Sequence, residues 1–237
     1  MPTTLLCLHG WGGSQESFTE LRAALAGTPD ISILTPDLPG FGAAPEPPKP
    51  WTTDDYADWV TRLIAQEHPT RLFIVGHSHG GRIALKLAAR HDIPIDRLFL
   101  CAAAGIRHPR HLKRMIGLVL AKCGKTLLMI PGLRSLAPIG RKFLYKLVRV
   151  HDYEKASPLM QQTLINVSRE DLRGILKDVT VPTEIFWGED DGLTPVGDGK
   201  LMAAAIPGAK LRIFPGVRHA VHRDRAEDIA REIRAAL

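Results

Sequence analysis

The residues best suited to chemistry form the stretch GHSHG at positions 76–80. A serine hydroxyl is a poor nucleophile until a base takes its proton and the surroundings stabilise the resulting oxyanion. A sharp turn from strand to helix would present Ser78 to a substrate, and such a turn needs small residues two positions before and after the serine. Gly76 and Gly80 meet this need, so the stretch predicts a turn built to hold a nucleophile.

A serine nucleophile also needs a base and a carboxylate that orients the base. His219 follows the last apolar run of the chain and is the first candidate for the base. His222 competes for this role, but we expect it to open the final helix and face solvent. The candidates for the carboxylate are three adjacent acids, Glu189, Asp190 and Asp191.

Six short apolar runs, each closed by turn residues, must position these groups. They cover residues 3–8, 31–34, 72–75, 98–101, 183–187 and 211–214, and they are typical of buried parallel strands. Helical patterns occur between or after them, at residues 14–26, 52–67, 82–90, 200–206 and 225–237, and the Thr-Thr-Asp-Asp sequence at 52–55 indicates a capped helix start. This alternation predicts an α/β fold with a mainly parallel sheet covered by helices on both faces.

The composition is typical of a globular protein with its own core. The chain has 237 residues, 45% hydrophobic and 24% charged, which suits one domain, or one domain with a sizeable insertion. Cys7, Cys101 and Cys123 are widely spaced, and we interpret them as free thiols in a reducing compartment. The sequence shows no signal peptide or membrane-spanning run, so a cytoplasmic protein is expected, with peripheral membrane attachment as an option.

The positive charge is concentrated in one segment. Residues 106–151 contain eleven Lys and Arg and no Asp or Glu, whereas the net charge of the whole chain is +6. The rest of the chain is therefore net negative. The strand–helix alternation also breaks over residues 106–178, where the pattern is helical. We therefore divide the chain into a core of residues 1–105 and 179–237 and an inserted, basic helical segment of residues 106–178.

Five motifs in order resemble those of the α/β-hydrolase family, and the resemblance covers nearly the whole chain. They are HGWGG at 9–13, DLPGFG at 37–42, GHSHG at 76–80, GEDDGLTP at 188–195 and GVRH at 216–219. In this family the serine, the acid and the histidine follow one another in this chain order. The resemblance implies a nucleophile at Ser78, an acid at Asp191 and a base at His219.

The resemblance also implies the other parts of a serine hydrolase. The backbone amides of Trp11 and His79 would form the oxyanion hole, and the Trp11 and His79 side chains are candidates for substrate contact, with ordinary packing as the alternative. Asp37 is expected to tie its own turn by side-chain hydrogen bonds. No metal or organic cofactor is implied.

In this family an insertion at residues 106–178 forms a lid that shapes the acyl pocket. The candidates for the substrate pocket are His9, Gly10, Met115, Leu118, Met129 and Phe143. The basic charge suggests an anionic substrate, an acidic carrier protein or an anionic membrane surface, unless it is only a solvated face. Nucleic acid is not expected, because no aromatic stacking platform accompanies the charge.

The resulting prediction is a serine hydrolase that cleaves a carboxylic ester or related acyl bond, in the manner of a carboxylesterase. The same three residues would also serve a carbon–carbon bond hydrolase or a perhydrolase. A protein of a different class, a hydrolase-fold receptor for small molecules with slow turnover, would keep the same residues. Fold alone does not decide between these functions.

Overall fold

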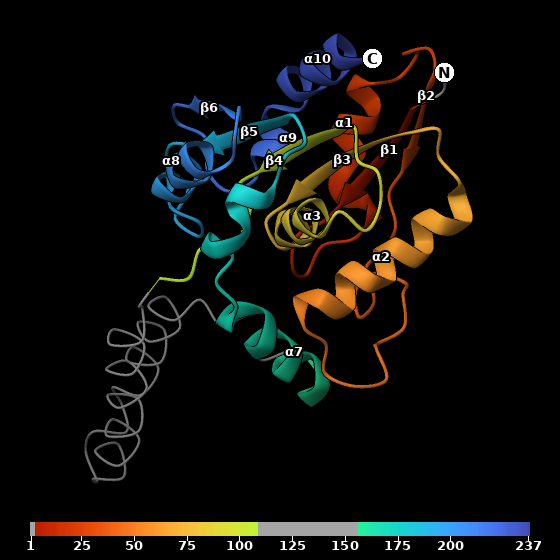
Figure 1. Ribbon diagram of the computed structural model, residues 1–237, viewed down its shortest axis with the longest axis vertical. Helices are drawn as coiled ribbons and strands as arrows, with labels where there is room; N and C mark the ends of the chain where they lie inside the picture. The colour runs from red at the N-terminus through yellow and green to blue at the C-terminus, as the bar shows by residue number, and fades with distance from the viewer. Residues whose placement is uncertain (1–2, 109–155) are drawn as a thin grey trace, which may run out of the picture. The chain divides into compact units, whose positions relative to one another are not determined.

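The computed structural model describes residues 3–108 and 156–237 (Figure 1). The chain divides into two compact units, one formed by Met1–Arg107 with Gln162–Leu237 and the other by His108–Gln161. Several predictions fall outside the described residues: the thiol at Cys123, most of the basic segment, and the pocket candidates Met115, Leu118, Met129 and Phe143.

A six-stranded parallel sheet forms the centre of the first unit. Its strands are β1 (Thr3–Leu8), β2 (Ile31–Leu34), β3 (Arg71–His77), β4 (Arg97–Cys101), β5 (Thr183–Gly188) and β6 (Lys210–Phe214). They lie in the order β2-β1-β3-β4-β5-β6, and each neighbouring pair is parallel. The six predicted strands are therefore confirmed, with ends that differ by one or two residues.

The sheet order decides where a site can form. The chain moves from β1 outward to β2 and then returns to place β3 on the other side of β1. The loops that follow β1 and β3 therefore leave the sheet in different directions, and the carboxyl ends of these two strands border a crevice. The residues after β1 begin at His9, and the residue after β3 is Ser78.

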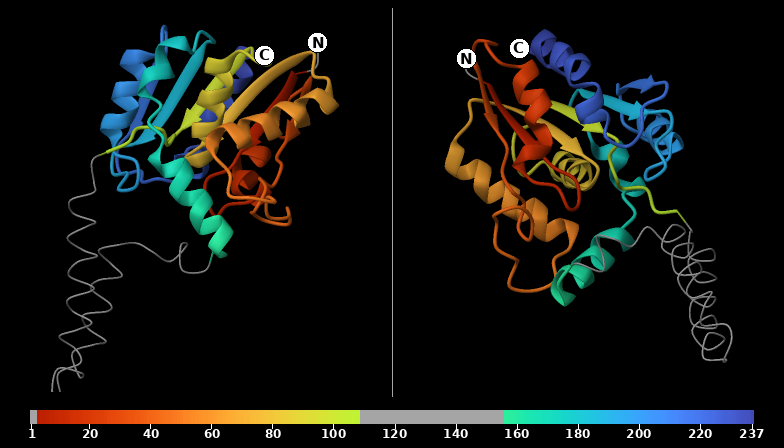
Figure 2. Two further views of the ribbon diagram at one scale, coloured as in Figure 1. Left: turned by 60° about the horizontal axis from the view of Figure 1, so that its bottom comes forward. Right: turned by 180° about the vertical axis from the view of Figure 1, so that it is seen from behind.

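Helices cover both faces of this sheet, as predicted. The helices of the described residues are α1 (Thr19–Ala24), α2 (Thr53–Glu67), α3 (His79–Arg90), α7 (Pro158–Arg169), α8 (Val196–Ala205), α9 (Val221–Asp224) and α10 (Ala226–Ala236), with 3-10 turns η1 (Gln15–Phe18) and η3 (Arg173–Asp178). Helices α1 and α10 pack together on one face, while α2 and α3 pack together on the other (Figure 2). The core between these layers includes Leu5, Phe73, Phe99 and Phe186, all without exposed surface.

The helix boundaries show where local pattern and structure differ. The predicted start of α2 is confirmed, because the Thr52 side chain accepts a hydrogen bond from the Asp55 amide in a capping box. Helix α3 begins at His79, three residues earlier than predicted, because the turn at Ser78 leads straight into it. The predicted final helix is preceded by a separate short helix, α9, which holds His222.

The turn at Ser78 depends on two glycines. Ser78 has φ 50° and ψ −110°, a conformation that L-residues rarely adopt. A Cβ atom on Gly76 would lie 2.7 Å from the Gly81 Cα, and a Cβ atom on Gly80 would overlap the carbonyl oxygen of Leu8 in β1. Side chains at these positions would therefore collide with backbone, which confirms the reason given for the glycines.

We expect Gly80→Ala to destabilise the fold by about 3 kcal/mol or more, because the Leu8 backbone in the central sheet has no room to move aside. Urea unfolding of the variant and the wild-type chain measures the loss. Gly197→Ala in α8 is the matched control, since its new Cβ would meet no described atom within 4 Å apart from its chain neighbours and the backbone of its own helix. It should be neutral or slightly stabilising. Equal effects of the two substitutions would contradict the steric account.

Candidate active site

Ser78 lies at the carboxyl end of β3, between that strand and α3. Its amide donates to the Cys101 carbonyl at 3.1 Å, and its own carbonyl accepts from the Ala104 amide at 2.8 Å. These bonds tie the strained turn to the end of β4. They hold the serine at the crevice in a fixed backbone conformation, which is the arrangement that a nucleophile needs.

Asp191 lies in the loop after β5 and its carboxylate is saturated with donors. Oδ1 accepts from the amides of Leu193 at 2.7 Å and Thr194 at 3.0 Å. Oδ2 accepts from the Thr194 hydroxyl at 2.7 Å and faces the His219 Nδ1 at 2.8 Å. Burial by itself would raise the pKa of Asp191, but the hydrogen bonds and the imidazole outweigh burial and the pKa lies below its ordinary value. The carboxylate is therefore ionised at neutral pH.

The other two acids of the loop do not reach the histidine. Glu189 and Asp190 are exposed, whereas the Asp191 side chain is fully buried. The Asp190 amide instead donates to the Val217 carbonyl at 3.0 Å, which ties the acid loop to the loop that carries His219. Of the three candidates, Asp191 is thus the one in contact with an imidazole.

His219 follows β6 and points its Nδ1 at Asp191. A carboxylate can only accept, so the neutral imidazole carries its proton on Nδ1 and leaves Nε2 as an acceptor. The described structure contains no direct hydrogen bond between the His219 ring and the Ser78 hydroxyl. His77 connects the two residues: it directly precedes Ser78 in the chain, and its Nε2 donates to the His219 carbonyl at 3.1 Å. Such contacts between nucleophile and base are often long in ligand-free enzymes.

The loop after β1 is held by a buried histidine. His9 has no exposed surface, its Nδ1 donates to the Gly10 carbonyl at 2.8 Å, and its Nε2 accepts from the Leu38 amide at 2.9 Å. Burial also lowers the pKa of His9, so the ring stays neutral. Both of its nitrogens are used by backbone groups, and the side chain of this pocket candidate therefore fixes the loop.

The neighbouring turn is tied by Asp37, as predicted. Its carboxylate accepts from the Gln15 amide at 2.6 Å and from the Ala43 amide at 2.8 Å. A Cβ atom on Gly42, which has φ 56°, would collide with this carboxylate. Asp37 is thus a structural residue.

Aromatic rings pack beside the serine. His79, the first residue of α3, is buried and has edge-on contacts with Trp11 at 5.4 Å and Tyr56 at 4.9 Å between ring centroids. Phe41 lies 4.8 Å from Trp11, and Trp51 lies 4.9 Å from Tyr56. Burial lowers the pKa of His79 to about 3, so its ring is neutral. As the first residue of a helix, His79 also has an amide without an intrahelical acceptor, available to an anion.

The prediction for His222 is wrong. Its side chain does not face solvent: the residue is 3% exposed, lies in α9 and stacks on His77 with ring centroids 3.7 Å apart. The other side of the ring contacts Phe18 at 5.5 Å. The sequence around His222 contains no signal of this packing, because its partners His77 and Phe18 come from distant parts of the chain.

Two residues with roles at the site were missed in the sequence. The Thr194 hydroxyl lies 3.2 Å from the Ala102 carbonyl and 3.3 Å from the His219 Nδ1, in addition to its bond with Asp191. His77 contacts His219 and stacks on His222. Their position inside two of the recognised motifs was the only available signal.

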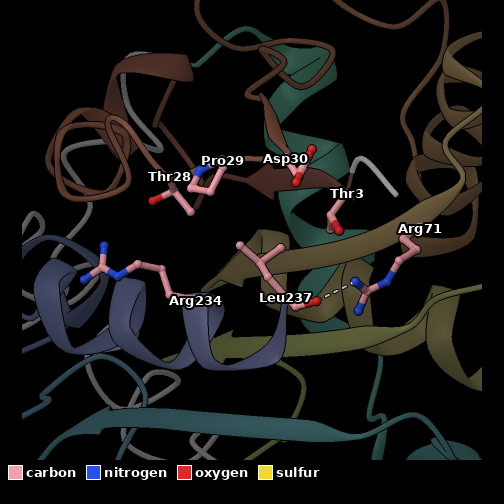
Figure 3. Close-up of a pocket in the computed structure, with 7 residues that line it drawn as sticks. All are labelled: Thr3, Thr28, Pro29, Asp30, Arg71, Arg234 and Leu237. Carbon is pink, nitrogen blue, oxygen red and sulfur yellow. Dashed lines mark hydrogen bonds between the residues drawn. The ribbon is translucent and has the colours of Figure 1, made fainter.

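A separate cavity of about 320 Å³ lies away from these residues (Figure 3). It is lined by Thr3, Thr28, Pro29, Asp30, Arg71, Arg234 and Leu237. Thr3 and Arg71 are the first residues of β1 and β3, so this cavity is at the amino ends of the strands. Ser78 is at the opposite ends, and the cavity is not part of the candidate site. Among the described helices, none has the length and apolar character needed to cross a bilayer.

Comparison with known proteins agrees with the geometry. The model of the alpha/beta hydrolase family matches residues 5–232. A pimeloyl-acyl-carrier-protein methyl ester esterase from Chromobacterium violaceum is 28% identical over 97% of this chain and 92% of its own. Its namesake from Neisseria meningitidis is 29% identical over 94% and 89%. The esterase structure from Exiguobacterium antarcticum has a TM-score of 0.75 at 22% identity, covering 98% of this chain and 91% of that one.

The neutral histidines around the site predict a steep loss of stability in acid. Burial lowers the pKa values of His9, His77, His79 and His222, the last two to about 3. An unfolded histidine has a pKa of about 6.5, so the unfolded chain binds more protons below that pH. The contribution of these histidines to the free energy of unfolding is therefore fully present above pH 6.5. It is lost progressively as the pH falls from 6.5 toward their pKa values in the folded state.

We expect His222→Phe to reduce this pH dependence by up to about 1.4 kcal/mol per pH unit, because one proton-binding group is removed from the unfolded chain. The free energy of unfolding in urea, measured from pH 7.5 to 4.5, gives the slope for each protein. The comparison uses slopes, so a constant difference in stability does not affect it. Parallel curves would show that His222 is protonated equally in both states.

Proposed function

The chain belongs to the alpha/beta hydrolase family, and on this basis we propose that it is a serine hydrolase that cleaves a carboxylic ester or a related acyl bond. The observation that carries the proposal is the 2.8 Å contact between Asp191 and His219, which come from separate loops. The His219 carbonyl in turn accepts a hydrogen bond from His77, the residue directly before the strained turn at Ser78. Relatives named as esterases make an ester the first choice of substrate.

In the acylation step, the Ser78 hydroxyl oxygen attacks the carbonyl carbon of the ester. The His219 Nε2 takes the hydroxyl proton, and Asp191 stabilises the imidazolium that forms. The amides of Trp11 and His79 donate to the carbonyl oxygen as it becomes negative, aided by the N-terminus of α3. The tetrahedral intermediate then collapses, His219 gives its proton to the leaving alcohol, and an ester bond joins the acyl group to Ser78.

In the deacylation step, water replaces the serine as nucleophile. The water oxygen attacks the acyl carbon while His219 takes one proton from the water. His219 then gives this proton to the Ser78 oxygen when the ester bond between the acyl group and Ser78 breaks. The products are a carboxylic acid and the free enzyme. The aromatic rings of Trp11, Phe41 and His79 lie beside the serine and are suited to an apolar acyl chain.

Ser78→Ala should lower the hydrolysis of p-nitrophenyl butyrate by about 10⁴-fold or more, because no other group can form the acyl-enzyme. His219→Gln should have a similarly large effect, and a fluorophosphonate probe should label the wild-type chain but not Ser78→Ala. Asp191→Asn should also lower the rate strongly, because the histidine loses the acid that orients it. Asp190→Asn is its matched control and should have little effect, since it removes the same charge from the same loop and Asp191 is the acid in contact with the histidine.

The same assay separates an enzyme from a receptor. If the wild-type chain turns over p-nitrophenyl acetate and butyrate no faster than Ser78→Ala does, and the probe does not label Ser78, a small-molecule receptor with this fold is favoured. If esters are not cleaved but the probe still labels Ser78, a carbon–carbon bond hydrolase or a perhydrolase becomes the better proposal.

We further propose that residues 106–178 act as a lid and that its charge recruits an ester bound to an acidic carrier protein. Eleven cations without a single acid between residues 106 and 151 would attract a negatively charged partner. The named activity of the Chromobacterium violaceum relative is on a carrier-bound ester. A carrier protein is therefore favoured over a membrane surface.

Replacing Lys113, Arg114 and Lys122 by Gln should lower kcat/KM for an acyl-carrier-protein methyl ester by about tenfold at low salt, because electrostatic attraction speeds encounter. Hydrolysis of p-nitrophenyl butyrate should be unchanged. The matched control replaces the exposed cations Lys49, Arg62 and Lys200, which lie outside the segment. Equal losses in both triple variants would refute a specific role, and sedimentation of the wild-type chain with anionic vesicles alone would favour a membrane.

A further inference from the structure

His77 occupies the space between the two loops that must converge on the serine. It is the last residue of β3, directly before Ser78, and it is 7% exposed. Its Nε2 donates to the main-chain carbonyl of His219 at 3.1 Å, and the two rings have centroids 4.9 Å apart. One edge of the ring therefore holds the backbone of the histidine loop.

The other edge of the ring meets the loop after β1. A Cβ atom on Gly10 would lie 2.9 Å from the His77 Nδ1, 3.1 Å from its Cε1 and 3.3 Å from the Ser78 Cβ. Gly10 thus rests on the His77 ring without space for a side chain. The next residue is Trp11, whose amide is a proposed oxyanion donor, so the position of this ring sets the distance between the donor and the serine.

His222 prevents the His77 ring from moving away. The two rings stack at 3.7 Å with an angle of 27°, and His222 is itself packed on Phe18. Burial, with the nearby His222 and His219, holds the pKa of His77 well below its ordinary range. The ring therefore remains neutral, and its one proton stays on Nε2, where the His219 carbonyl accepts it.

The far end of the histidine loop has its own anchor. The Val217 carbonyl accepts from the Asp190 amide at 3.0 Å, and a Cβ atom on Gly188 would collide with the carbonyls of Val217 and Arg218. These contacts fix the loop relative to the acid. The bond from His77 to residue 219 fixes it relative to the nucleophile, which the acid loop cannot do.

We propose that His77 is a positioning residue that sets both the histidine loop and the oxyanion loop in register with Ser78. The inference rests on the proposed serine hydrolase activity. It assigns His77 no proton transfer and no contact with substrate. Its contribution is to the geometry of the reacting groups, where a displacement of about 1 Å costs about 10²-fold in rate.

The first test compares His77→Phe with His77→Gln in the hydrolysis of p-nitrophenyl butyrate. Phe fills the space but has no donor for the His219 carbonyl, and we expect kcat to fall about 30-fold with KM within about threefold of wild type. Gln has an N–H group at a similar reach, and it should restore kcat to within about fivefold of wild type. A purely structural role predicts that the apolar Phe is tolerated at least as well as Gln.

His222→Phe is the control for the loss of an imidazole from the stack, because it keeps a stacked ring and does not alter the donor to residue 219. We expect its kcat to stay within about threefold of wild type. Wild-type kcat in His77→Phe, or equal losses in the Phe and Gln variants, would overturn the inference. If Ser78→Ala is inactive while one of these two results is obtained, the inference about His77 fails and the proposed serine hydrolase activity stands. If Ser78→Ala keeps full activity, the proposed function itself is refuted.

A second test does not depend on the stability of His77→Phe. Gly10→Ala should lower kcat about tenfold in the wild-type background, because its Cβ pushes against the His77 ring. In a His77→Ala background the same substitution should lower kcat by only about threefold or less, since the two closest contacts are then gone and only the 3.3 Å approach to the Ser78 Cβ remains. Equal effects of Gly10→Ala in the two backgrounds would show that His77 does not position the loop.

Discussion

The close approach of main-chain segments around the turn at Ser78 is the constraint on which the site depends. The helix backbone at Gly80 lies against the Leu8 carbonyl, and the strand at Gly76 lies against Gly81. This contact leaves Ser78 in a backbone conformation that costs about 1–3 kcal/mol. Hydrogen bonds to Cys101 and Ala104 hold the turn against that strain. The serine is thereby fixed to the rigid centre of the sheet, and the other groups have to be brought to it.

The groups that the proposed mechanism needs at the serine come from loops at the carboxyl ends of different strands. The loop after β1 supplies Trp11, that after β5 supplies Asp191 and that after β6 supplies His219. A parallel sheet places all these ends at one edge, and the reversal of strand order beside β1 opens the crevice there. The tight contacts at Gly10 and Gly188 then limit how far the loops can move.

The buried acid of the site is ionised, whereas the buried histidines around it are neutral. Asp191 has no exposed side-chain surface, yet it stays ionised because amides, a hydroxyl and an imidazole all face its oxygens. His77 and His222 stay neutral, because burial lowers the pKa of each ring. A positive charge that forms on His219 therefore lies beside an ionised acid on one side and uncharged rings on the other, which suits a base that must gain and release a proton.

The sequence by itself determined the strands, the turn glycines and the order of the motifs, because these follow from local pattern and from backbone sterics. The resemblance of the loop at 188–195 to a family motif also singled out Asp191 from its neighbours. Only the tertiary structure decided the burial of His222 and the contacts of His77, whose hydrogen-bond partner His219 is 142 residues away in the chain. Contacts of this kind leave no periodic signal, since each depends on how separate loops pack over the end of the sheet.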